Sequence, residues 1–139
     1  VLTETPVQRF LVFRVGADKK NRKASCILED FRRPFKSVYY DYQDLDLDAD
    51  CVRMMNEVEK DIVHQIVTSK LENDSILKRI YEAEGVKYSC VFLIYKSKDY
   101  MYYASAATSE NIQEYSKLAK NRIELTRGKI KSIFEKHKV

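Results

Sequence analysis

The sequence contains few of the residues that form the common cofactor and metal sites. Its three glycines, Gly16, Gly85 and Gly128, assemble neither a GxxxxGK[ST] loop nor a GxGxxG turn, which excludes nucleotide binding by those routes. Its two histidines, His64 and His137, are too far apart to form a local metal pair, and neither has a cysteine at helical spacing. We therefore expect no metal ion and no cofactor.

The chain also lacks a disulfide pattern and a long apolar run. Cys26, Cys51 and Cys90 are odd in number and widely spaced, which favours reduced thiols and a cytoplasmic or nuclear location. No apolar run approaches the roughly 18–20 residues that span a bilayer, and the first residues show no secretory pattern. We expect no membrane contact.

The composition is that of one folded domain. The 139 residues are 45% hydrophobic and 33% charged, so residues 1–139 are expected to form a single domain with a sizeable core. The chain starts at Val1 instead of Met, which also suits a fragment of a longer protein.

Five segments are predicted to form strands. Residues 7–15, 24–30 and 36–43 are rich in aromatic and β-branched residues, and a polar turn separates the first two. Residues 88–95 form the most hydrophobic run of the chain, and a short turn joins them to residues 100–105. The two close pairs predict hairpins.

Helical spacing predicts a long amphipathic helix over residues 48–70. Its apolar positions are Cys51, Met55, Val58, Ile62 and Ile66. A second, short helix is expected between the caps Asn73-Asp74-Ser75 and Gly85, and further helices after Ser109. The predicted fold class is α+β: a mainly antiparallel sheet of about five strands, packed by the long helix and the C-terminal helices.

Charge is unevenly distributed along the chain. Residues 1–40 carry a net charge of +5, residues 41–84 carry −7, and residues 85–139 carry +6. Separate charged surfaces favour recognition of a charged partner, most simply another protein or a second copy of the chain. The alternative is that these charges only keep the domain in solution.

The acidic segment before the long helix is open to two interpretations. Asp46, Asp48, Asp50 and Glu57 have the spacing of ligands in a calcium-binding loop, but Cys51 occupies the position that needs glycine. Acidic residues before a helix also stabilise its N-terminus without any metal. We favour this capping interpretation.

Tyrosines on the predicted strands, next to basic residues, suggest nucleic acid as an alternative partner. Aromatic side chains on a sheet stack the bases of single-stranded RNA or DNA, and basic residues contact the phosphates. The candidate residues for this function are Arg9, Arg14, Tyr40 and Tyr102.

One stretch carries a family resemblance. The apolar strand Cys90-Val-Phe-Leu-Ile-Tyr95, a turn, and then Met101-Tyr-Tyr-Ala-Ser105 resemble the ADF/cofilin homology domain. In that family the second segment opens an actin-contacting helix. The resemblance implies actin as a partner, with these contact residues: Met101, Ser105, Lys117, Lys120 and Arg122.

No catalytic constellation emerges from the sequence. The serines, aspartates and two histidines show no nucleophile-elbow or base-relay spacing, so no catalytic residue is named. The sequence therefore predicts a non-catalytic interaction domain that binds a protein partner through charged and aromatic surface. Actin binding and nucleic-acid binding are the alternatives.

Overall fold

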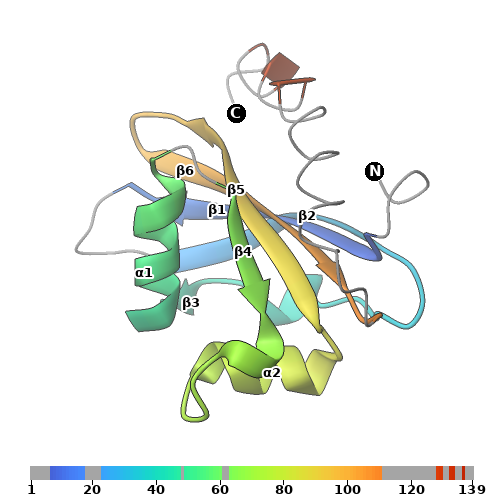
Figure 1. Ribbon diagram of the computed structural model, residues 1–139. Helices are drawn as coiled ribbons and strands as arrows, with labels where there is room; N and C mark the ends of the chain where they lie inside the picture. Colours follow the sequence, from blue (N-terminus) through green and yellow to red (C-terminus); the bar gives the residue numbers. More distant parts are fainter. Residues whose placement is uncertain are drawn as a thin grey trace.

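The computed structural model shows a curled sheet with two short helices (Figure 1). It describes residues 7–17, 23–47, 49–60 and 63–110, together with residues 128, 129, 132, 133 and 136. Within this part of the chain, no helix is long and apolar enough to cross a lipid bilayer.

Six strands form one antiparallel sheet in the order β3-β2-β1-β6-β5-β4. The strands are β1 (Arg9–Gly16), β2 (Lys23–Phe31), β3 (Leu45–Asp46), β4 (His64–Val67), β5 (Tyr88–Lys96) and β6 (Tyr100–Thr108). The register shifts once between β1 and β2 and once between β5 and β6. Such irregularities increase local twist and bend, and so favour the curl of the sheet.

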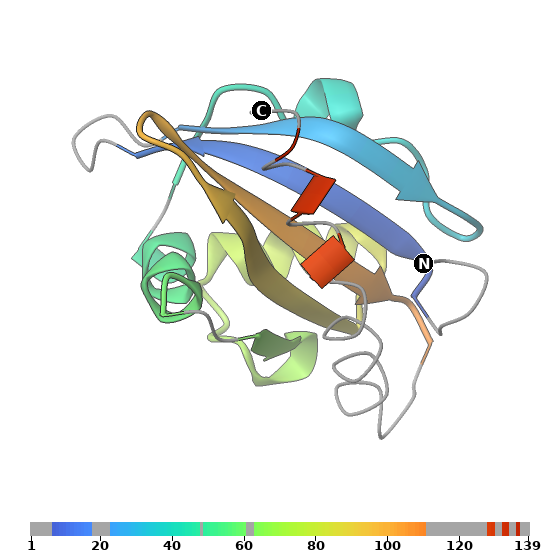
Figure 2. The same cartoon turned by 90° about the horizontal axis from the view of Figure 1, so that it is seen from above.

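Helices α1 (Ala49–Val58) and α2 (Ile76–Glu84) lie on the same face of the sheet (Figures 1 and 2). Two short 3₁₀ helices, η1 (Tyr39–Asp41) and η2 (Thr68–Lys70), lie in the connections. The Ser75 hydroxyl accepts a hydrogen bond from the Lys78 amide at the start of α2, and Gly85 ends the helix with a φ of 80°. This left-handed conformation favours glycine, so the predicted caps of this helix are confirmed.

Alternation along the strands divides the core between the two faces of the sheet. Buried side chains on the helix-covered face include Val15, Val91, Met101 and Tyr103, and Met55, Val58 and Tyr81 of the helices pack against them. The opposite face carries a second buried cluster that includes Phe10, Val12, Phe92, Ile94 and Tyr102. The central strands are therefore buried on both sides.

The predicted fold class, α+β with a long amphipathic helix packed on a sheet of about five strands, is wrong. The helix expected over residues 48–70 stops at Val58, and His64–Val67 is edge strand β4, paired with β5. The β-branched residues Ile66 and Val67 fit a pleated strand, and the four-residue spacing of the pairs 62/66 and 63/67 imitated a helix. The molecule is mostly a curled six-stranded sheet.

Two other predictions need comment. Residues 36–43 do not form a strand but contain the 3₁₀ helix η1, in which Tyr40 is 87% exposed. The predicted C-terminal helices fall on residues 109–139, most of which lie outside the described residues.

The buried cluster on the sheet face opposite the helices provides a test of the core. Phe92 is fully buried and lies 6.4 Å from the Phe10 ring, measured between ring centroids. We expect Phe92→Ala to lower the free energy of unfolding by about 3–5 kcal/mol, because it removes a buried ring and leaves a cavity. Tyr40→Ala is the control, with an expected change within about 0.5 kcal/mol in urea denaturation. Similar losses in both variants would contradict this core.

Candidate functional site

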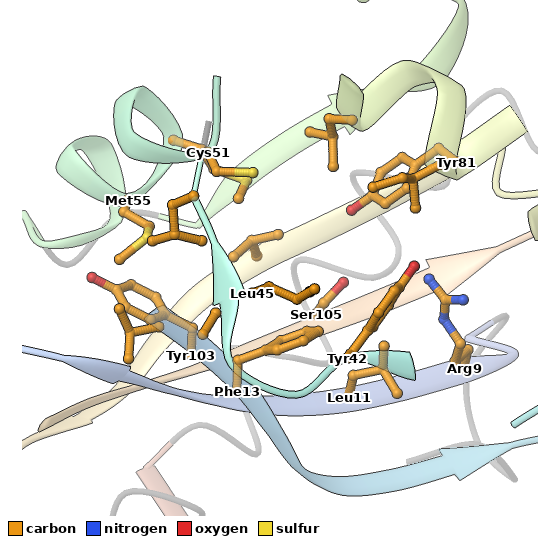
Figure 3. Close-up of a pocket in the computed structure, with 17 residues that line it drawn as sticks. Arg9, Leu11, Phe13, Tyr42, Leu45, Cys51, Met55, Tyr81, Tyr103 and Ser105 are labelled. Atoms are coloured by element: carbon orange, nitrogen blue, oxygen red, sulfur yellow. The ribbon is translucent and has the colours of Figure 1, made fainter. Parts of the chain in front are cut away.

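A pocket of about 140 Å³ lies between the sheet and the two helices (Figure 3). Its lining comes from the sheet, from the segments beside β3 and from both helices. The sheet contributes Arg9, Leu11, Phe13, Val15, Ala24, Leu45, Val91, Tyr103 and Ser105; the segments on either side of β3 contribute Tyr42 and Leu47; the helices contribute Cys51, Met54, Met55, Leu77, Ile80 and Tyr81. The lining is almost entirely apolar.

The floor of the pocket follows from strand register. Leu11 of β1 lies opposite Ser105 of β6, and Ser105 lies opposite Val91 of β5, so the three side chains form a row across the sheet. A parallel row contains Phe13 and Tyr103. Small side chains such as Ser105 in the centre of the floor leave the space that the pocket occupies.

The inner faces of helices α1 and α2 form the roof of the pocket. Cys51, Met54 and Met55 lie on the inner face of α1, and Leu77, Ile80 and Tyr81 lie on the inner face of α2. Residues three, four and seven positions apart share one helix face, so the apolar face of each helix turns toward the floor. Glu84 continues the face of α2 that begins at Leu77.

One end of the pocket is polar. Arg9 is only 2% exposed, and its Nη1 donates a hydrogen bond of 2.8 Å to Oε1 of Glu84, forming an ion pair. The Tyr42 hydroxyl donates to the other carboxylate oxygen of Glu84. Three segments far apart in sequence thus meet at a single carboxylate, which neutralises the buried guanidinium.

The guanidinium of Arg9 also contacts an aromatic ring. Its carbon lies 4.9 Å above the centroid of the Phe35 ring, a cation–π contact. Among the described residues, Arg9 Nε has no hydrogen-bond partner, although the atom is buried. Native proteins pair most buried donors, so this nitrogen is exceptional.

Burial keeps two tyrosines of the pocket protonated. Burial raises the pKa of Tyr42 far above 10.0, and the hydrogen bond to the Glu84 carboxylate raises it further. Burial also raises the pKa of Tyr81, whose hydroxyl lies 3.0 Å from Oγ of Ser89. Both phenols remain neutral over the physiological range.

Two larger hollows are less suitable for a small ligand. A hollow of about 440 Å³ lies between Glu82, Lys87 and Tyr88, and one of about 400 Å³ lies between Arg53, Glu57 and His64. Charged, solvent-exposed side chains border each hollow, whereas ligand pockets are mostly apolar and enclosed.

The structure separates the residues predicted to bind nucleic acid. Arg14 lies opposite Tyr102 in the sheet register and stacks on the Tyr100 ring at 4.7 Å. Tyr102 itself is 4% exposed, Arg9 is buried at the end of the pocket, and Tyr40 lies in η1. The four residues do not form one surface.

The residues that the ADF/cofilin resemblance names are only partly described. Met101 and Ser105 lie on strand β6 with their side chains buried, where the resemblance implies the opening of a helix. Lys117, Lys120 and Arg122 lie outside the described residues. Actin binding stays a prediction.

The acidic segment is only partly described, since Asp48 is among the residues left out. Asp46 is exposed and forms an ion pair of 3.8 Å with Lys23. No group of three or more metal-binding side chains occurs within the described residues.

Sequence reasoning missed the pocket itself. Arg9, Leu11, Phe13 and Val15 alternate along β1, and this pattern could have shown that Arg9 points inward with the apolar side chains. Nothing in the sequence indicates that Tyr42 and Glu84 would meet Arg9, because 33 and 75 positions separate them from it.

Comparisons with known proteins bear on the fold. No family model matches the chain, and no curated protein matches it. Among solved structures, the chain is similar to the phycocyanobilin-bound GAF domain from a cyanobacterial phytochrome, with a TM-score of 0.57 and 15% sequence identity. The match covers 94% of this chain and 78% of that one. Similarity at this level shows a GAF-like fold and nothing further.

The environment of Tyr42 at the polar end of the pocket predicts how the stability of the protein depends on pH. Unfolded Tyr42 releases its proton near pH 10.0, whereas folded Tyr42 retains it, so its contribution to stability falls as the pH rises above 10. At neutral pH, Tyr42→Phe should lower the free energy of unfolding by about 1–3 kcal/mol, because Glu84 loses a donor. This difference from the wild type should shrink as the pH approaches about 11.

Urea denaturation of both proteins at several pH values measures the effect. Burial also raises the pKa values of Tyr81 and Tyr102, but these residues are present in both proteins, so their contributions cancel. If the difference in free energy of unfolding between the two proteins stays constant from neutral to alkaline pH, folded Tyr42 does not retain its proton as described.

Proposed function

We propose that this chain is a small-molecule-binding domain that holds a compact, largely apolar ligand between the sheet and helices α1 and α2. The observation that carries the proposal is the apolar pocket between the sheet and the helices, with a buried arginine at one end. Binding sites of small molecules commonly combine an apolar lining with a few fixed polar groups.

The volume of the pocket sets the size of the ligand. An apolar cavity of about 150 Å³ is large enough to stay dry and bind benzene. The pocket measures about 140 Å³, so it accommodates one aromatic ring or an aliphatic group of similar size.

The similarity of fold supports small-molecule binding in general terms. The similar structure is a GAF domain described as phycocyanobilin-bound, which shows that this architecture supports a small-molecule complex in that protein. Identity of 15% carries no ligand across to this chain. The class of ligand has to come from the pocket itself.

A cytoplasmic or nuclear location is part of the proposal. It is supported by Cys26, Cys51 and Cys90, none of which forms a disulfide bond in the structure. The protein partner expected from the charge distribution stays a prediction, as do a second copy, actin and nucleic acid. Two contacts reduce the charge separation between the basic residues 1–40 and the acidic residues 41–84. Arg9 forms an ion pair with Glu84, and Lys23 forms one with Asp46.

Filling the pocket tests the function. Ala24 lines the pocket, and Ala24→Leu places three further carbon atoms in it. Toluene, a one-ring probe, should raise the Tm of the wild-type chain. At a hundredfold excess over its Kd, it should raise the free energy of unfolding by about 2.7 kcal/mol. Ala24→Leu should show no such rise, because the probe and the new side chain compete for the same volume.

Ala83→Leu is the matched control, since Ala83 is exposed on α2 and gains the same atoms outside the pocket. This variant should respond to toluene as the wild type does. The absence of any response in the wild type, or an undiminished response in Ala24→Leu, would overturn the proposal.

A further inference from the structure

We propose that the apolar pocket and the hollow of about 400 Å³ beside strand β4 form one binding site for an amphipathic molecule. An apolar ring or short chain of the ligand occupies the pocket, and an uncharged polar head group, such as a hydroxyl or an amide, lies in the hollow. This inference rests on the proposed function and names the chemical class of its ligand. It starts from two side chains, Met54 and Leu77, that line both spaces.

Met54 of α1 and Leu77 of α2 separate the pocket from the hollow. Both side chains are partly exposed, as expected for residues that line an interior pocket on one side and an open hollow on the other. Among the described residues, these are the two that border both spaces. The partition between the spaces is therefore formed by single side chains.

The identity of Met54 allows this partition to open. Methionine has an unbranched side chain with three rotatable bonds, and it adapts readily to changes in its surroundings. Rotation of the Met54 side chain joins the two spaces and leaves helices α1 and α2 in place (Figure 1). In the hollow, Ile66 and Leu71 add apolar surface for the linker of the ligand.

The polar side chains of the hollow determine the charge of the head group. Arg53, Asn56 and Glu57 are exposed on α1, and His64 of β4 lies partly buried beside them. Burial lowers the pKa of His64 below 6.5, although the nearby Glu57 carboxylate opposes the shift, so the imidazole is neutral at pH 7. The opposite charges of Arg53 and Glu57 then leave the lining without net charge.

A neutral head group that both donates and accepts hydrogen bonds matches this lining. Arg53 provides donors, Glu57 provides acceptors, and Asn56 and neutral His64 each provide both. A hydroxyl or an amide can use partners of either kind. A charged head group would be attracted by one of the two ionised side chains and repelled by the other.

Four probes with the same aromatic ring test the inference. Toluene has no head group, and benzyl alcohol has a hydroxyl on a linker too short to leave the pocket. Phenylpropanol carries a hydroxyl on a propyl chain, and phenylpropanoate carries a carboxylate at the same distance. Their dissociation constants for the 139-residue chain can be measured by ligand-observed NMR.

Two side chains report where each probe lies. Met54 lines both spaces, whereas His64 lines only the hollow. Toluene, benzyl alcohol and phenylpropanol should all shift the NMR signal of the Met54 methyl group. Phenylpropanol should also shift the imidazole signals of His64, and the two shorter probes should leave them unchanged. Phenylpropanoate should bind more weakly than phenylpropanol.

Glu57→Ala and Glu82→Ala are matched variants. Both glutamates are exposed on helices, but Glu57 lines the hollow beside β4 and Glu82 lines the other one. Glu57→Ala should reduce the affinity for phenylpropanol relative to toluene by about two- to tenfold, because the head group loses a hydrogen-bond acceptor. Glu82→Ala should retain the wild-type ratio. The same ratio in all three proteins would overturn the placement of the head group.

The outcomes distinguish this inference from the function on which it rests. If phenylpropanol shifts the signal of Met54 but not those of His64, or if phenylpropanoate binds more tightly than phenylpropanol, the pocket is a binding site but the inference is wrong. If none of the four probes binds, both the function and the inference fail.

Discussion

The arrangement of the pocket depends on one buried ion pair. Arg9 of β1 meets Glu84 at the end of α2, and Tyr42, from the connection before β3, donates to the same carboxylate. A buried charge is tolerated only when it is paired and hydrogen-bonded, and removing one partner of such a pair costs about 3–5 kcal/mol. The pair therefore holds α2 and the segment containing Tyr42 close to the sheet.

The apolar volume of the pocket has a separate origin. The helices present mostly large apolar side chains toward the sheet, while Ser105 and Ala24 provide little volume on the sheet side. Protein interiors are normally packed to high density, so space of this size under two amphipathic helices is a departure that favours a ligand. Polar anchoring at one end and apolar space at the other give the pocket a direction.

Local signals in the sequence predicted part of this fold. The hairpin of β5 and β6 and the capped helix α2 were identified because their hydrophobic runs, turn residues and caps lie close together in the chain. The long helix was wrong because Ile66 continues the helical spacing of Met55 and Val58, although strand β4 pairs it with β5. Spacing of apolar residues does not encode which edge of a sheet is available.

The site was harder to predict than the fold. Its floor needs the register of β1, β6 and β5, and its polar end joins Arg9, Tyr42 and Glu84 across most of the domain. Only tertiary structure brings such residues together, so a single arginine among apolar residues looked like part of a basic surface. In the fold it is one of the most completely buried side chains.

The central claim is that the space between the sheet and the helices is an apolar cavity open to ligands. A crystal structure of the chain under xenon pressure tests this most directly, because xenon enters dry apolar cavities of this size. The account predicts xenon bound beside Leu11 and Val91, with the pair between Arg9 and Glu84 intact. A collapsed cavity, or one filled with ordered water and free of xenon, would contradict it.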